Sequence, residues 1–305
     1  MNIISTNNWN DKLDEMIVIG GSARSGTTMI GKIIHSMKGV EYFYEPPLLT
    51  SILMKEDELT IESLREILGF YLYDSLFLDS LAGRNVNLNK NDDSCIYNVK
   101  EINEIQDRFK KSFSRIELEE VSKRSTLSFK LPEIVFFLET LKKISPCSKL
   151  VLMHRNANDV ISSIVKKRWF SNEFIKESHN NQVYAVKIIN GIKIPFWVQE
   201  KDVEFWLNAD EINKCAYYCL KISESIINNS DNAIIVDYNF FIVDPVEKTE
   251  YLAEKLGLIF TDKTRKILST VKCQNKEKWE WGGKINKNLA NQIEVANLNI
   301  IKLSI

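Results

Sequence analysis

Short continuous hydrophobic runs along the chain alternate with longer stretches in which apolar residues recur every three or four positions. The continuous runs predict strands that are covered on both faces, because a strand with one solvated face would alternate apolar and polar residues. These runs lie at residues 16–19, 40–44, 127–130, 149–153 and 233–237. The periodic stretches predict amphipathic helices. The clearest of them begin near Thr27 and Pro132, after a turn at residues 156–158, and after Pro245.

Strands that alternate with helices in this way predict a parallel sheet with helices packed on both faces. We therefore expect an α/β fold with three layers, α/β/α, around a central parallel sheet. Two polar stretches, at about 51–125 and 170–230, are predicted to be helical insertions. No repeat or low-complexity linker divides the 305 residues, so residues 1–305 are expected to form a single domain.

Composition narrows the classes of partner. Lys and Arg total 40 against 41 Asp and Glu, a formal net charge of -1, so neither nucleic acid nor an anionic membrane is expected as a partner. The five cysteines are scattered without a CxxC pair, which favours free thiols over a metal site. No apolar run reaches the length of a membrane span and the N-terminus lacks the plan of a signal peptide, so a soluble, cytoplasmic protein is expected.

The first hydrophobic run passes through a glycine-rich turn directly into a helix. The turn reads Gly21-Ser22-Ala23-Arg24-Ser25-Gly26-Thr27-Thr28. Its backbone N–H groups and the positive end of the helix face one point, which predicts an anion site. A nucleoside triphosphate loop carries lysine directly after its last glycine. Here Thr27 stands in that position, and Arg24, inside the turn, supplies the basic group instead.

A second anion-binding pattern follows the run at 149–153. Arg155 stands where that strand is expected to end, and Ser163 follows eight residues later on the next helix. A guanidinium binds phosphate through two parallel hydrogen bonds, and a hydroxyl adds a neutral donor. The alternative is that Arg155 pairs with Asp159 and that Ser163 is an ordinary helix residue.

Four of the predicted strands end at polar groups. These are the glycine turn, Glu45, Lys130 and Arg155. Ligands of open parallel sheets bind outside the carboxyl ends of the strands. The sequence therefore predicts that these four groups meet at one edge of the sheet.

Together these motifs resemble those of sulfotransferases, which use 3′-phosphoadenylyl sulfate (PAPS) as sulfuryl donor. The glycine turn resembles their loop for the 5′-phosphosulfate, and Arg155 with Ser163 resembles their segment for the 3′-phosphate. Lys130-Leu131-Pro132 is similar to their lysine-proline element, whose ammonium would contact the sulfuryl group or the bridging oxygen. The resemblance implies a P-loop-type fold, PAPS as co-substrate, adenosine 3′,5′-bisphosphate as product and no metal.

The segment Phe43-Tyr44-Glu45-Pro46 resembles the aromatic-Glu-Pro segment of carbohydrate sulfotransferases, and its glutamate that of tyrosylprotein sulfotransferases. This implies transfer to a hydroxyl of a glycan or glycolipid, with Glu45 as the general base and with Arg24 and Lys130 assisting. Cytosolic small-molecule sulfotransferases place a histidine where Leu131 stands here. His154 is the rival base, and Glu45 has the alternative of capping its strand or pairing with Arg24.

Other functions stay open at this point. The acceptor could be a tyrosyl peptide or a small molecule. A magnesium-dependent P-loop kinase would use Asp237 as a metal ligand, but the missing lysine after Gly26 argues against it. A nucleotide-binding protein without catalysis is the remaining alternative. The loose match of residues 279–284 to the loop that closes over the nucleotide in relatives competes with a plain Gly-Gly turn.

Overall fold

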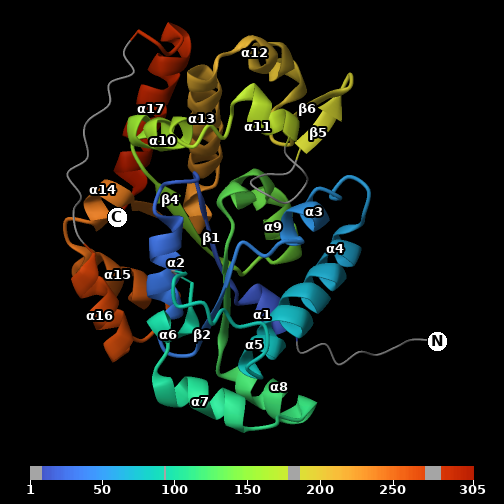
Figure 1. Ribbon diagram of the computed structural model, residues 1–305, viewed down its shortest axis with the longest axis vertical. Coiled ribbons are helices and arrows are strands. Elements are labelled where there is room, and N and C mark those ends of the chain that lie inside the picture. The colour runs from blue at the N-terminus through green and yellow to red at the C-terminus, as the bar shows by residue number, and fades with distance from the viewer. Residues whose placement is uncertain (1–8, 93, 178–185, 272–282) are drawn as a thin grey trace.

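The computed structural model describes residues 9–92, 94–177, 186–271 and 283–305 (Figure 1). A sheet of five parallel strands forms its centre, in the order β2-β3-β1-β4-β7. The strands are β1 (Ile17–Gly21), β2 (Val40–Tyr44), β3 (Thr126–Lys130), β4 (Lys149–His154) and β7 (Ala233–Asp237). The predicted α/β fold with a central parallel sheet is confirmed, and each strand coincides with one of the predicted runs to within two residues.

Side chains alternate across the strands and build one hydrophobic core on each face. In β1, Ile17 and Ile19 enter one core, whereas Val18 enters the other. The first core is covered by α2 (Thr27–His35), α6 (Ile96–Val99), α14 (Tyr238–Phe241), α15 (Pro245–Leu256) and α16 (Asp262–Thr270). The second core is covered by α1 (Trp9–Asp14), α4 (Ile61–Leu68), α9 (Leu138–Ile144), α10 (Ala157–Val165), α13 (Glu211–Asn228) and α17 (Lys287–Leu303). Burial on both faces explains why the strands read as continuous apolar runs.

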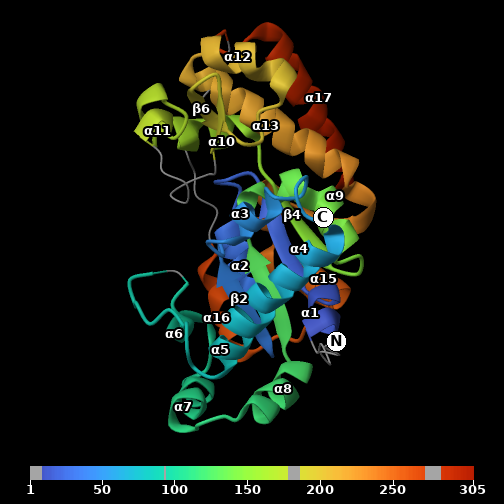
Figure 2. The same ribbon diagram turned by 90° about the vertical axis from the view of Figure 1, so that its right-hand side faces the viewer.

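The first polar stretch consists largely of helices. Besides α4 and α6 it holds α3 (Leu49–Leu53), the π-helix η1 (Gly69–Leu78), α5 (Asp79–Leu81), α7 (Ile102–Lys110) and α8 (Arg115–Lys123). Figure 2 shows α7 and α8 beyond one end of the sheet and α13 with α17 beyond the other. Among the described residues, no helix is long and apolar enough to cross a membrane.

The second polar stretch contains a hairpin among its helices. It holds α11 (Asn172–Glu177), η3 (Glu200–Asp202), α12 (Val203–Asn208), α13 and η4 (Ser230–Asn232), but also an antiparallel hairpin of β5 (Val186–Ile189) and β6 (Ile192–Pro195). Asn190 and Gly191 form its turn with φ of 50° and 79°. An Asn-Gly pair between β-branched residues is a strong hairpin signal, which the helical periodicity of the flanking segments obscured.

A buried ion cluster fixes the edge strand β2. Glu41 lies opposite Arg108 of α7, with Oε1 2.6 Å from the guanidinium, and it also accepts a hydrogen bond of 2.8 Å from Ser80. Burial works to raise the pKa of Glu41, but Lys100 and Arg108 outweigh it and lower that pKa. Removing one partner of such a cluster leaves a buried charge uncompensated. The cluster therefore holds in place the strand that leads into Glu45.

Three further segments were singled out in the sequence or adjoin such segments. The 3-10 helix η2 (Pro132–Phe137) begins at the predicted proline and continues into α9. Gly257, with φ of 69°, ends α15. Most of the segment 279–284, which resembles a nucleotide-covering loop, lies outside the described residues.

Candidate functional site

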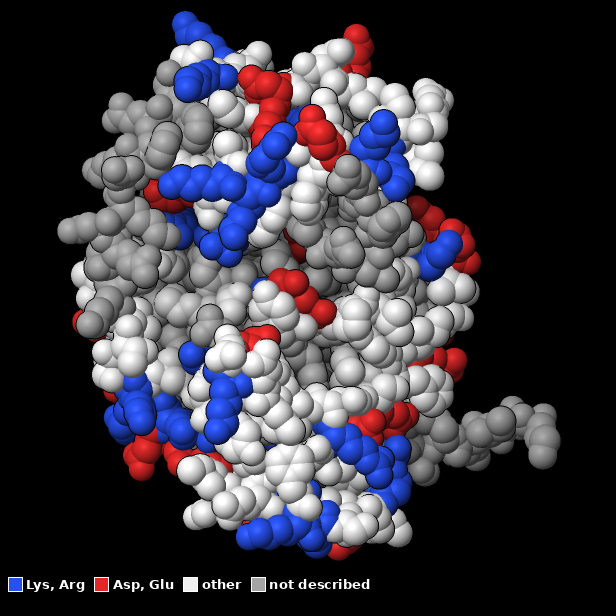
Figure 3. Space-filling view, in the orientation of Figure 1, with Lys and Arg blue, Asp and Glu red and all other residues white. Residues whose placement is uncertain are grey.

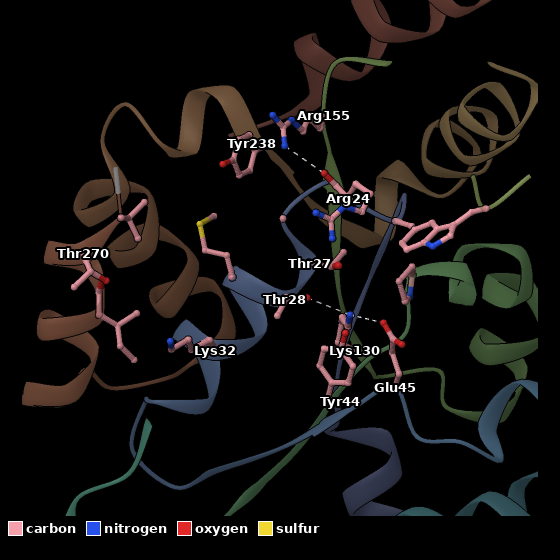
Figure 4. A pocket seen from close by; sticks show the side chains of 17 residues that line it. Arg24, Thr27, Thr28, Lys32, Tyr44, Glu45, Lys130, Arg155, Tyr238 and Thr270 are labelled. Carbon is pink, nitrogen blue, oxygen red and sulfur yellow. Dashed lines mark hydrogen bonds and ion pairs between the residues drawn. The ribbon is translucent and has the colours of Figure 1, made fainter. Parts of the chain in front are cut away.

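The carboxyl ends of β1, β2, β3 and β4 surround an open pocket of about 560 Å³ (Figure 4). The glycine turn and the start of α2 form its floor, and Glu45, Lys130 and Arg155 reach it from the other three strand ends. The prediction that these groups gather at one edge of the sheet is therefore matched by their positions. A pocket of this size lies within the usual range for small ligands, about 300–1,000 Å³.

Two glycines let the turn lie close to its neighbours. Gly21 has φ of 132°, and a Cβ there would overlap the carbonyl oxygen of Met153 on β4. Gly26 has φ of 97° and precedes the first residue of α2, and a Cβ there would lie 2.6 Å from the ring of Tyr238. Only glycine combines these positive φ angles with so little space. The N-terminus of α2 is thereby held open toward the pocket.

The two segments predicted to bind phosphate lie against each other. Nε of Arg24 donates a hydrogen bond of 2.9 Å to the hydroxyl of Ser163, and the Arg24 carbonyl accepts one of 3.4 Å from Arg155. Arg155 also pairs with Asp159 through two nitrogens, at 3.0 and 3.1 Å, as the alternative interpretation predicted. Its guanidinium carbon lies 4.3 Å from the ring centroid of Tyr238. Arg24 and Arg155 thus line one part of the pocket, and the Ser163 hydroxyl lies behind Arg24 as its hydrogen-bond partner.

Glu45 and Lys130 form an ion pair at the opposite side of the turn. The Lys130 ammonium lies 2.5 Å from Oε1 of Glu45, 3.3 Å from the Thr28 hydroxyl and 4.0 Å from the ring centroid of Tyr44. Lys130 is buried, whereas the Glu45 side chain is 41% exposed. Glu45 therefore pairs with Lys130 and not, as one alternative had it, with Arg24. The carboxylate is positioned by a buried cation and open to solvent.

The backbone is strained at two of these positions. Arg24 has φ of 68° and Glu45 has φ of 44°. Left-handed backbone costs a residue with a Cβ roughly 1–2 kcal/mol, and strained residues of this kind cluster at functional sites. Arg24 and Glu45, whose side chains line the pocket, therefore have unfavourable backbone conformations.

The structure adds Glu133 and Tyr218, which the sequence analysis missed. The Tyr218 hydroxyl accepts a hydrogen bond of 2.8 Å from the Ala23 N–H and donates one of 3.5 Å to Glu133. Burial raises the pKa of Glu133 to about 7, and the charge of Glu45 adds to this shift. A glutamate in the apolar segment after Pro132 was the available signal for Glu133, whereas Tyr218 follows the core periodicity of α13.

His154 and Asp237 form a buried pair with each other. Nδ1 of His154 lies 2.8 Å from Oδ2 of Asp237, and Nε2 lies 3.1 Å from Asn297 of α17. Oδ1 of Asp237 accepts the N–H groups of Asn239 and Phe240. Neither side chain lines the pocket, so the geometry favours neither a base at His154 nor a metal at Asp237. Within the described ranges, no cluster of three His, Cys, Asp or Glu residues could hold a metal ion.

Several solved structures are similar to this chain. The sulfotransferase domain of the olefin synthase from Synechococcus PCC 7002 is 15% identical with a TM-score of 0.46, and the match covers 94% of this chain and 92% of that one. The sulfotransferase domain of the curacin biosynthetic pathway is 16% identical with a TM-score of 0.47, covering 88% and 80%. Sulfotransferase STF1 from Mycobacterium tuberculosis H37Rv is 13% identical with a TM-score of 0.42, covering 94% and 76%.

Comparison of the sequence itself identifies the family of this chain. No curated protein matches the chain significantly. The profile of the sulfotransferase family, however, matches residues 16–187, a segment that contains the glycine turn, Glu45, Lys130, Arg155 and Ser163. Because this match covers more than half of the 305 residues, the protein belongs to the sulfotransferase family and is a sulfotransferase enzyme.

Proposed function

We propose that this enzyme transfers the sulfuryl group of PAPS to a hydroxyl of a glycan or glycolipid. One observation carries the proposal: a single pocket joins an anion-binding part, made by the turn, Arg24 and Arg155, to the Glu45–Lys130 ion pair, and Ser163 is hydrogen-bonded to Arg24. The first part has the donors that a nucleotide with two separate phosphate groups requires. The second part has a carboxylate placed to accept a proton.

Different groups of the protein would bind the two phosphate-bearing ends of PAPS. The N–H groups of the turn and the N-terminus of α2 would bind the 5′-phosphosulfate, because both present partial positive charge to an anion. Arg155 and Ser163 would bind the 3′-phosphate. Asp159 keeps the Arg155 guanidinium in one orientation through two hydrogen bonds, so less side-chain entropy is lost when phosphate binds.

Transfer itself needs positioning and charge stabilisation. By analogy with phosphoryl transfer, the acceptor oxygen bonds to sulfur in line with the bridging oxygen, whose bond to sulfur breaks. Glu45 takes the proton of the acceptor hydroxyl. Lys130, 2.5 Å from Glu45, stabilises the negative charge that remains on the 5′-phosphate oxygen of adenosine 3′,5′-bisphosphate. Arg24 stabilises charge on the sulfuryl oxygens from the other side of the turn.

The acceptor class rests on the surroundings of Glu45. The segment from Phe43 to Pro46 carries the resemblance to carbohydrate sulfotransferases, and Tyr44, beside Glu45, is 48% exposed. An exposed aromatic ring next to the base offers an apolar face for a sugar ring. A tyrosyl peptide or a small alcohol would use the same donor site and is the competing acceptor.

The proposal is tested by transfer of labelled sulfate from PAPS to a panel of sugars, glycolipids and tyrosyl peptides. Labelling of a sugar hydroxyl is expected, and the Arg155→Ala variant should label it poorly. Labelling of peptides alone would replace the acceptor class. If no acceptor is labelled and adenosine 3′,5′-bisphosphate does not bind, the proposed function is wrong.

Glu45→Gln tests the base. A general base contributes about 10²- to 10⁴-fold to turnover, so kcat should fall by that factor while the Kd for adenosine 3′,5′-bisphosphate is unchanged. Steady-state kinetics and calorimetry measure the two quantities. Glu120→Gln, at an exposed position of α8, is the matched control and should behave as the wild type. Equal turnover of Glu45→Gln and the wild type would exclude Glu45 as the base.

A further inference from the structure

An apolar groove begins three residues after Glu45. It lies among α3, α4 and η1, has a volume of about 530 Å³, and its main apolar lining comes from Leu48, Ile52, Leu59, Ile67, Phe70 and Tyr71. This volume lies within the range of small-ligand sites. The groove is separate from the donor pocket, with which it shares no lining residue.

Three of the apolar residues that line the groove are exposed. Leu48 is 51% exposed, Phe70 57% and Ile67 39%. Single exposed apolar residues are common, but several that converge on one groove indicate a binding surface. Burying them under a ligand would remove this apolar area from water, which is favourable in proportion to the area.

Most polar groups of the lining already have partners within the protein. Lys55 is paired with Glu58 at 2.7 Å, the Tyr71 hydroxyl accepts the Leu48 N–H at 3.3 Å, and the Ser75 hydroxyl donates to the Phe70 carbonyl at 3.2 Å. The lining contains no carboxylate. The groove therefore offers little to sugar hydroxyls or to phosphate, and its chemistry fits a hydrocarbon.

The groove is continuous in the chain with the proposed base. Only Pro46 and Pro47 separate Glu45 from Leu48, and three residues span at most about 10 Å. The Leu49 N–H donates to the Pro46 carbonyl at 3.1 Å, which bends this connection into a turn and shortens it further. A hydroxyl at Glu45 and an apolar chain in the groove can therefore belong to one molecule.

We propose that the groove binds the hydrocarbon chain of the acceptor, so that the acceptor is an amphiphilic alcohol whose polar end lies at Glu45. This inference rests on the proposed function, because Glu45 defines where the reacting hydroxyl lies. Of the two acceptor classes proposed above, a glycan or a glycolipid, it selects the one that carries an alkyl or acyl chain. A second copy of this chain is the competing occupant.

Direct binding tests the groove without turnover. The neutral dye prodan is bound to the protein and displaced by methyl, butyl, hexyl and octyl β-D-glucoside. Displacement should strengthen by about fourfold for each methylene until the groove is filled. Phe70→Gln and Ile67→Gln should each weaken displacement by octyl glucoside at least tenfold. Ile116→Gln, at a position of α8 that is 73% exposed, is the matched control and should bind as the wild type does.

Turnover separates the inference from the proposed function. With PAPS and alkyl glycosides of whichever sugar the acceptor panel labels, KM should fall as the chain lengthens, and Phe70→Gln should raise KM for the octyl but not the methyl compound. Labelling that is independent of chain length overturns the inference and leaves the proposed function standing. Dye displacement without any labelled acceptor overturns the proposed function and leaves an apolar-ligand groove.

Two further outcomes would overturn the inference. Equal effects of Phe70→Gln and Ile116→Gln on dye displacement would show that the groove does not bind the chain. A concentration-dependent dimer in sedimentation velocity that Phe70→Gln dissociates would show that a second copy covers the groove instead.

Discussion

Single residues at this site carry several interactions at once, and Arg155 is the clearest example. Its guanidinium pairs with Asp159, reaches the carbonyl of Arg24 and lies over Tyr238. The pairing with Asp159 was expected as an alternative to phosphate binding, yet both are compatible. A guanidinium has five N–H donors, and Asp159 accepts from only two nitrogens.

Arg155→Ala is expected to lower affinity for adenosine 3′,5′-bisphosphate by about 10- to 100-fold, since hydrogen bonds to charged groups contribute roughly 1.5–3 kcal/mol. Affinity for adenosine 5′-monophosphate, which lacks the 3′-phosphate, should change little. Calorimetric titration with both nucleotides measures the difference. Arg84→Ala, at a side chain that is 73% exposed, is the control. A similar loss for both nucleotides would contradict the assignment of Arg155 to the 3′-phosphate.

Glu133 makes the stability of the fold depend on pH. Its pKa is raised by burial from 4.5 to about 7, so between these values the folded protein keeps a proton that the unfolded chain has lost. The stabilisation is fully present below pH 4.5 and is lost as the pH rises to 7. At ~1.4 kcal/mol for each pKa unit, the loss is about 3 kcal/mol.

Glu133→Gln should remove this loss, because glutamine stays neutral at every pH. The difference in unfolding free energy between variant and wild type should shift by about 3 kcal/mol in favour of the variant between pH 4.5 and pH 8. Urea unfolding at both pH values measures it. Glu139→Gln, exposed on α9, should show no such shift. A constant difference between Glu133→Gln and wild type would mean that Glu133 ionises normally.

At the scale of elements, the turn between β1 and α2 depends on close packing against other segments. Gly26 illustrates this, because it combines a positive φ with a ring 2.6 Å from the place of a Cβ. Gly191, in the turn of the β5–β6 hairpin, has a positive φ of 79° but open space around it. A Cβ at Gly26 would meet both backbone strain and steric overlap, whereas a Cβ at Gly191 would meet backbone strain alone.

Gly26→Ala should lower affinity for adenosine 3′,5′-bisphosphate at least tenfold, because Tyr238 and the turn must move apart. Gly191→Ala should cost only the backbone term, about 1–2 kcal/mol of unfolding free energy, and should leave nucleotide affinity unchanged. Urea unfolding and calorimetry on both variants provide the comparison. Nucleotide affinity that is unaffected by Gly26→Ala would show that the turn does not form the anion site.

The elements of the fold differ in how well they could be predicted from the sequence. The central strands were predictable, because burial on both faces turns each into an uninterrupted apolar run. The hairpin was not, since each of its strands has only four residues and burial does not alternate along them, with the two buried residues, Ile194 and Pro195, adjacent in the chain. Short strands of this kind carry little periodicity, and only the Asn190-Gly191 turn marks them.

At the scale of the whole molecule, strand order decides which site residues become partners. Glu45 and Lys130 could each be placed at a strand end from the sequence, but their ion pair could not. It follows from the pairing of β2 with β3, in register at Tyr44 and Lys130. Arg24 follows β1, one strand farther along the sheet, so it does not reach Glu45. Tyr218 was unpredictable for a related reason, because only the packing of α13 brings it to Ala23.

Charged side chains of both signs lie together on one face of the molecule. Figure 3 shows Lys and Arg side chains interspersed with Asp and Glu side chains over the face that it draws. This distribution agrees with a formal net charge of -1. Attraction of anionic substrates therefore depends on local groups in the donor pocket and not on a long-range field.

The left-handed backbone at Arg24 and Glu45 has a consequence for laboratory evolution. Glycine would relieve the strain at both positions, so a selection for heat resistance alone would favour variants that lack the guanidinium and the carboxylate. Such a selection would produce a more stable protein without the two side chains that act in transfer. Directed evolution of this enzyme for thermal stability therefore has to measure turnover in every round, above all for variants at Arg24 and Glu45.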